Sequence, residues 1–101
     1  MDIKVTTEGT VAKLHMKGRF DFNVHRSFKE AYDPLLHQNG INSLDIDLAE
    51  VEYLDSSALG MLLLVRERAE AVGKPVVLSR PSPTVAQILD IANFRKLFTI
   101  C

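Results

Sequence analysis

The chain has 101 residues, a length typical of one domain, and its 47% hydrophobic and 25% charged residues are ordinary for a globular protein. Twelve basic and thirteen acidic side chains give a formal net charge of −1, which argues against a nucleic-acid binder. The single cysteine, Cys101, excludes an internal disulfide framework and a cysteine-rich zinc site. With no signal-like segment and no stretch of ~18 apolar residues, we expect one soluble cytoplasmic domain, residues 1–101, that does not enter a membrane.

The first fifth of the chain is expected to form a hairpin. Residues 3–6 and 11–17 are predicted strands, joined by a short turn around Gly9. In the second strand, polar and apolar side chains alternate with the period of a half-buried strand. Residues 18–23 follow and are predicted to be a loop.

A first amphipathic helix is predicted over residues ~24–38, because its apolar side chains recur at helical spacing. Asp21 or Asn23 can cap its start. Pro34 lacks a backbone donor and disfavours helical geometry in the residue before it, so we expect a kink or a broken final turn. Gly40 closes the element.

A third strand is predicted at residues 43–48. Its leucine and isoleucine side chains share one face, whereas Asp45 and Asp47 share the other. A strand buried on both faces would not alternate in this way, so helices should cover mainly one face of the sheet.

The second half of the chain repeats the alternation of helix and strand. A helix over residues 57–72 should end at Gly73, and a short strand should follow at residues 76–78. Residues 85–92 fit a third helix, and residues 94–100 a helical turn with a small strand. The order ββαβαβα predicts an α/β domain with a mixed sheet of four to five strands and three to four helices.

The most informative segment is Asp55-Ser56-Ser57 at the start of the second predicted helix. Either serine, or the aspartate, can serve as an ordinary N-cap, and that explanation alone is common. However, two serines exceed what one cap requires, and the helix that follows is apolar nearly all round. A helix N-terminus also suits a phosphate, because its dipole and free N–H groups favour an anion. These features together indicate a phosphorylated serine beside a partner-binding surface; geometry alone does not choose between Ser56 and Ser57.

Leu54-Asp55-Ser56-Ser57-Ala58-Leu59-Gly60, after a strand of the Leu44–Leu48 type, resembles the motif of STAS domains, in particular of the bacterial anti-sigma factor antagonists. The resemblance covers almost the whole chain. Gly18-Arg19-Phe20-Asp21 is similar to a loop of that family, as are Gly73 to Leu78 and Val85 to Phe98 to its later elements.

The resemblance implies a phosphorylation switch. In this family the residue after the motif aspartate is phosphorylated, which places the phosphate on Ser56 and makes Ser57 the less favoured site. It further implies that the unphosphorylated protein binds an anti-sigma factor, or a serine kinase or response-regulator switch protein, and so releases a sigma factor. A PP2C-like phosphatase would remove the phosphate. The predicted partner-binding residues are Arg19, Phe20, Asp21, Asp55, Ser57, Ala58, Gly60, Met61 and Leu64.

Two residues depart from the family pattern. Ala58 replaces a more usual glycine, which favours a firm first helical turn but adds a methyl group where a kinase would approach. Arg19 stands where the family often has glutamate, and this reversal of charge predicts a different partner.

Other functions are less well supported. A hydrolase would need a nucleophile, a base and an acid in register, and the three histidines are expected to be ordinary surface residues, so we expect no enzyme and no cofactor. Asp45, Asp47 and Glu50 lack a metal-loop pattern, so no metal site is expected. Arg95 and Lys96 are too small a basic patch for DNA. A STAS scaffold subunit that is not phosphorylated remains the main alternative.

Overall fold

The computed structural model describes all residues, 1–101, as five strands and three α-helices. The strands are β1 (Asp2–Glu8), β2 (Val11–Phe20), β3 (Ser43–Leu54), β4 (Val76–Ser79) and β5 (Thr99–Ile100). The helices are α1 (His25–Leu36), α2 (Ser56–Ala71) and α3 (Pro83–Ile91), with single 3₁₀ turns at Phe22–Val24 and Phe94–Lys96. The predicted α/β class and element order are confirmed.

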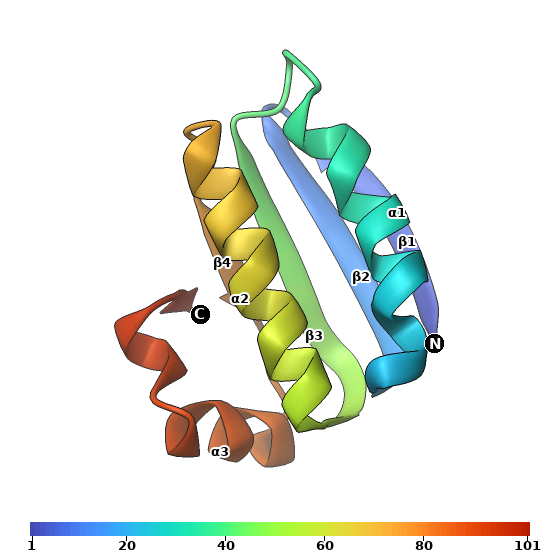
Figure 1. Ribbon diagram of the computed structural model, residues 1–101, viewed down its shortest axis with the longest axis vertical. Helices are drawn as coiled ribbons and strands as arrows, with labels where there is room; N and C mark the ends of the chain where they lie inside the picture. The colour runs from blue at the N-terminus through green and yellow to red at the C-terminus, as the bar shows by residue number, and fades with distance from the viewer.

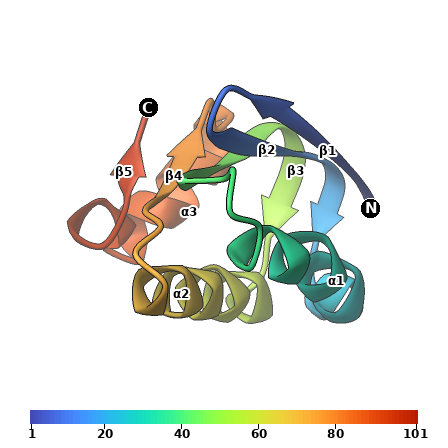
Figure 2. The same cartoon turned by 90° about the horizontal axis from the view of Figure 1, so that it is seen from above.

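The five strands form one mixed sheet in the order β1-β2-β3-β4-β5 (Figure 1). β1 is antiparallel to β2, whereas the other neighbours are parallel. Figure 2 shows α1 and α2 together on one face of the sheet, as the alternation in residues 43–48 predicted. α3 lies beyond the carboxyl ends of the strands, where β3 ends and α2 begins (Figure 1). No helix is both long and apolar enough to cross a membrane.

Twenty-six buried apolar side chains form one continuous core between the sheet and the helices. α2 contributes side chains on its sheet-facing side, among them Leu62 and Val65, which are fully buried. The alternation in β3 places Leu44, Ile46 and Leu48 in this core. Burial on this scale is the main force that fixes α1 and α2 against the sheet.

The central strands are longer than predicted. β2 continues through Gly18 and Arg19 to Phe20, which the sequence suggested was a loop, and β3 continues to Leu54 instead of ending at residue 48. The register of β2 against β3 shifts between His15 and Lys17 and again between Gly18 and Arg19. Gly18 has a φ of +110°, which a side chain would disfavour, so the glycine that suggested a loop allows a bulge inside the strand.

The helices differ less from their predicted bounds than the central strands do. A 3₁₀ turn capped by Asp21 precedes α1, so α1 begins at His25; Asn23 caps nothing. α1 contains Pro34 and ends two residues later at Leu36, well before Gly40. α2 ends next to Gly73, as predicted, and this glycine has a φ of +73°.

Candidate functional site

The motif Asp55-Ser56-Ser57 lies at the first turn of α2, at the carboxyl end of the sheet (Figure 1). Asp55 is the N-cap: its Oδ1 accepts a hydrogen bond from the backbone N–H of Ala58 at 2.8 Å. The aspartate thus satisfies the helix start, and neither serine hydroxyl is the cap. Capping alone therefore does not account for the two serines.

Asp55 also connects the two segments that the sequence singled out. Its Oδ2 accepts from the backbone N–H of Phe22 at 3.3 Å, and its own N–H donates to the carbonyl of Phe20 at 3.2 Å. Asp21 in turn accepts from the N–H of Asn23 at 3.0 Å. The end of β2 and the start of α2, more than 30 residues apart in sequence, are in this way held against each other.

The two serines differ in exposure. Ser56 is exposed, whereas Ser57 is half-buried. Both lie in the first turn of the helix, where backbone N–H groups have no partner within the helix and the dipole favours negative charge. A phosphate on Ser56 would therefore be accessible to an incoming enzyme and electrostatically tolerated by the helix.

Three of the predicted partner-binding side chains do not reach the surface. Phe20 and Ala58 are 0% exposed and Met61 is 6% exposed, because all three pack into the core. They support the surface and do not form it. The concern that the methyl group of Ala58 obstructs a kinase is also wrong, because this methyl points inward. Arg19, Asp21, Asp55, Ser57, Gly60 and Leu64 retain at least partial exposure.

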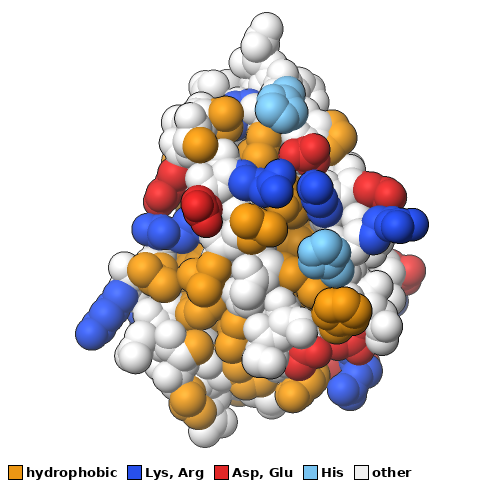
Figure 3. All heavy atoms as spheres, in the orientation of Figure 1, with side chains coloured by type: hydrophobic (Ala, Val, Ile, Leu, Met, Phe, Trp, Pro, Cys, Tyr) orange, Lys and Arg blue, Asp and Glu red, His pale blue; other side chains and the backbone are white.

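The surface around Ser56 contains apolar side chains that the sequence analysis did not select. Phe22 is 68% exposed, and Ile91, at the end of α3, is 76% exposed. Tyr53 is exposed on β3. The guanidinium carbon of Arg19 lies over its ring, 5.0 Å from the ring centre. Figure 3 shows hydrophobic surface gathered toward this end of the molecule, where α2 begins and α3 lies.

A shallow groove of about 320 Å³ lies between the end of β3, α2 and α3. Leu59 of α2 and Ile88 and Ile91 of α3 line it, with Ser56 beside them. Ile88 follows the apolar period of α3 but is only partly buried. One signal was present in the sequence: Ile91 falls outside the apolar period of α3, so a core role never explained it.

Gly60 lies one turn after Ser56 in α2. It is exposed, and a Cβ built at this position would meet no atom within 4 Å. Glycine inside a helix costs roughly 0.5–1 kcal/mol relative to alanine. The fold does not require this glycine, and its lack of a side chain leaves the helix surface beside Ser56 open.

The chain is similar to known proteins over almost its whole length. The family model of the Mlab, STAS domain matches residues 3–99. A STAS-domain containing protein of Pseudomonas aeruginosa (strain UCBPP-PA14) is 40% identical over 95 residues, which cover 94% of this chain and 92% of that protein. The anti-sigma F factor antagonist of Lysinibacillus sphaericus is 25% identical over 89 residues, covering 88% of this chain and 74% of that protein.

Solved structures show the same fold. The anti-sigma factor antagonist SpoIIAA in its unphosphorylated form matches with a TM-score of 0.82 at 17% identity, covering 99% of this chain and 88% of that one. The Bacillus cell fate determinant SpoIIAA in the phosphorylated form matches with a TM-score of 0.75 at 16% identity, covering 99% of this chain and 91% of that one. The chain therefore belongs to the STAS-domain family and has the fold of the anti-sigma factor antagonists.

Proposed function

We propose that the protein is a phosphorylation-switched anti-sigma factor antagonist. In its unphosphorylated form it binds an anti-sigma factor or a switch-kinase partner and so releases a sigma factor; phosphorylation of Ser56 ends this binding. The observation that carries the proposal is an exposed serine at a helix start, left free by the Asp55 cap and bordered by exposed apolar side chains.

The physical basis of the switch is the cost of covering a charge. A partner that packs on Phe22, Tyr53 and Ile91 removes water from the surface beside Ser56. A phosphate there adds about −1.5 to −2 charges, and burying it without a cationic partner costs far more than the apolar contact gains. Asp55 adds a like charge next to it. The phosphorylated surface would thus repel the partner while the fold stays intact.

This function requires two further activities from other proteins. A serine kinase, which is either the anti-sigma factor itself or a related switch kinase, must reach Ser56, and a PP2C-like phosphatase must reverse the reaction. We place the cycle in the cytoplasm. The chain itself acts as a binding module: Arg19, Asp21 and Asp55 position the surface, while Ser56 carries the signal.

The test is a pair of baits, Ser56→Ala and Ser56→Glu, used for affinity capture and then for titration against the captured partner. We expect the alanine variant to bind at least as tightly as wild type, and the glutamate variant to bind at least about tenfold more weakly, a loss of about 1.4 kcal/mol. Phosphopeptide mass spectrometry on protein from cells should find the phosphate on Ser56.

Ser57→Glu is the matched control, because it adds the same charge one residue further on at a half-buried position. Thermal unfolding of each variant separates loss of binding from loss of fold. Equal affinity of Ser56→Glu and wild type, together with no phosphate on Ser56 in cells, would instead identify a non-switching scaffold subunit.

A further inference from the structure

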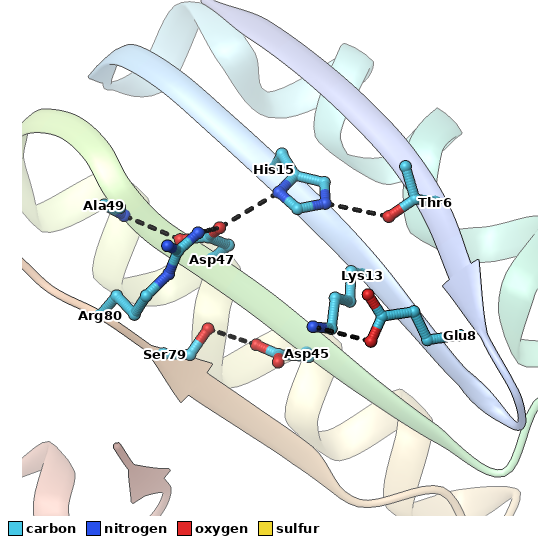
Figure 4. Close-up of polar contacts among 9 residues, drawn as sticks. All are labelled: Thr6, Glu8, Lys13, His15, Asp45, Asp47, Ala49, Ser79 and Arg80. Atoms are coloured by element: carbon cyan, nitrogen blue, oxygen red, sulfur yellow. Dashed lines mark hydrogen bonds and ion pairs between the residues drawn. The ribbon is translucent and has the colours of Figure 1, made fainter.

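The face of the sheet that no helix covers carries an ordered polar network (Figures 2 and 4). Thr6 of β1, His15 of β2 and Asp47 of β3 lie across three neighbouring strands and are joined by hydrogen bonds. The Oγ1 of Thr6 lies 2.9 Å from the Nε2 of His15, and the Nδ1 of His15 lies 3.1 Å from the Oδ2 of Asp47. The proposed switch uses none of these residues.

The direction of these hydrogen bonds follows from the carboxylate. An ionised Asp47 only accepts, so Nδ1 of His15 must carry the proton that it donates. In the neutral imidazole, Nε2 is then an acceptor, and the hydroxyl of Thr6 donates to it. A hydroxyl held by a histidine that a carboxylate orients is the arrangement that activates a nucleophile.

Asp47 is well fixed for this orienting role. It is the only buried charged residue of the protein, although it lies on the uncovered face. Burial alone would raise its pKa, but hydrogen bonds from Arg80, from the N–H of Ala49 and from His15 outweigh burial and hold the pKa below its usual value. Asp47 therefore stays ionised at neutral pH, which keeps His15 in one tautomer.

Two cationic side chains border the network. Arg80 pairs with Asp47 from a backbone with a φ of +53°, a conformation that is uncommon for a non-glycine residue and costs it energy. Lys13 lies directly opposite Thr6 in the β1–β2 register, on the same face, and its ammonium is 3.2 Å from the carboxylate of Glu8.

We propose that Thr6 is an activated hydroxyl and a site of covalent acylation by small activated acyl donors, such as aryl esters or acyl phosphates. The Oγ1 of Thr6 attacks the carbonyl carbon while its proton passes to Nε2 of His15. The bond from the carbonyl carbon to the leaving group breaks, and the leaving group departs with its electron pair and takes up that proton. The products are an ester on Thr6 and the protonated leaving group, with no change of oxidation state.

The experiment uses the full chain and p-nitrophenyl acetate as the probe, with peptide mapping by mass spectrometry after short exposures. General-base assistance typically contributes 10²–10⁴-fold. We therefore expect Thr6 to be acetylated at least about tenfold faster than Thr7, its exposed neighbour, which points to the other face of β1. His15→Gln should slow acetylation of Thr6 at least about tenfold and leave that of Thr7 unchanged.

Two controls keep the outcome interpretable. Thr6→Val keeps the shape of the side chain and should abolish the adduct on residue 6, while acetylation of lysines in the same digest reports equal exposure to the reagent. Thermal unfolding of His15→Gln shows whether the sheet is intact, and the rate at Thr7 reports local opening of β1. Acetylation of Thr6 at the rate of Thr7, or a rate at Thr6 that is unaffected by His15→Gln, would overturn the proposal.

Discussion

The two ends of α2 lie in contrasting surroundings. At its start, Ser56 is exposed beside apolar side chains, and Gly60 leaves the helix surface flat. At its other end the chain passes through Gly73 and Lys74 into β4, and the helix carbonyls find partners. The start of the helix leaves the Ser56 side chain exposed, whereas the last turn pairs its backbone carbonyls within the chain.

The far end shows how complete this pairing is. The N–H of Gly73 donates to the carbonyl of Glu70 at 3.0 Å, and the N–H of Lys74 to that of Ala69 at 2.9 Å, which is a Schellman motif. The ammonium of Lys74 then donates to three carbonyls at the end of α1: those of Leu35, Leu36 and Gln38, at 2.9–3.0 Å. A cation at this position also complements the helix dipole. Under the proposed function, stability and binding are concentrated at opposite ends of α2, so substitutions should separate them.

The largest effect is expected at the stabilising end. Lys74→Met keeps the length of the side chain but removes the ammonium, and with it three hydrogen bonds to carbonyls at the end of α1. We expect the free energy of unfolding to fall by about 2 kcal/mol. For a domain of this size that corresponds to a decrease in Tm of about 10 °C, measurable by circular dichroism.

Lys96→Met is the control, since Lys96 is an exposed lysine of the 3₁₀ turn after α3 and its loss should change stability by no more than about 0.5 kcal/mol. Below the melting temperature of Lys74→Met, affinity for the partner should match wild type. A large loss of affinity with unchanged stability would contradict the division between the two ends.

The second effect is expected in binding alone. Ile91→Ser removes an exposed aliphatic side chain from the groove beside Ser56, and we expect the partner to bind about tenfold more weakly. Stability should change by less than about 0.5 kcal/mol, because Ile91 is 76% exposed. Isothermal titration and thermal unfolding measure the two quantities.

Val72→Ser provides the matched substitution at the opposite end of α2, because Val72 is also an exposed aliphatic residue. Its affinity for the partner should equal that of wild type. Equal losses for Ile91→Ser and Val72→Ser would show that the partner does not distinguish the two ends.

Local patterns predicted much of this architecture. Alternation in residues 11–17 and 43–48 identified the two central strands and the face of the sheet that helices cover, and Gly73 marked the end of α2. These features depend on neighbours within a few residues, which periodicity and capping rules describe. Gly18 is an exception: the glycine suggested a loop, but the structure has a bulge inside a continuous strand.

The site itself was predictable only in part. The motif at Asp55 singled out the start of α2, but spacing did not reveal that Asp55 is the cap or that Ser56 is the more exposed serine. Which side chains reach the surface depends on packing, so the sequence predicted neither the burial of Phe20, Ala58 and Met61 nor the exposure of Ile91. The bonds of Lys74 span 36 to 39 residues, and those of His15 join three strands, so no local pattern contains them.

The smallest effect, and the sharpest in sign, is expected at Gly60. A methyl group at this position meets nothing within the chain, and alanine is the better helix former, so Gly60→Ala should raise the free energy of unfolding by roughly 0.5–1 kcal/mol. The same methyl group would obstruct a partner that approaches the helix closely beside Ser56, so affinity should fall by a few-fold. Ala71→Gly, at an exposed position in the last turn of α2, is the converse control and should lower stability without changing affinity. Thermal unfolding and titration on one set of proteins test both signs; a Gly60→Ala variant that gains stability and binds as tightly as wild type would show that the partner contacts the serine end without touching this turn of α2.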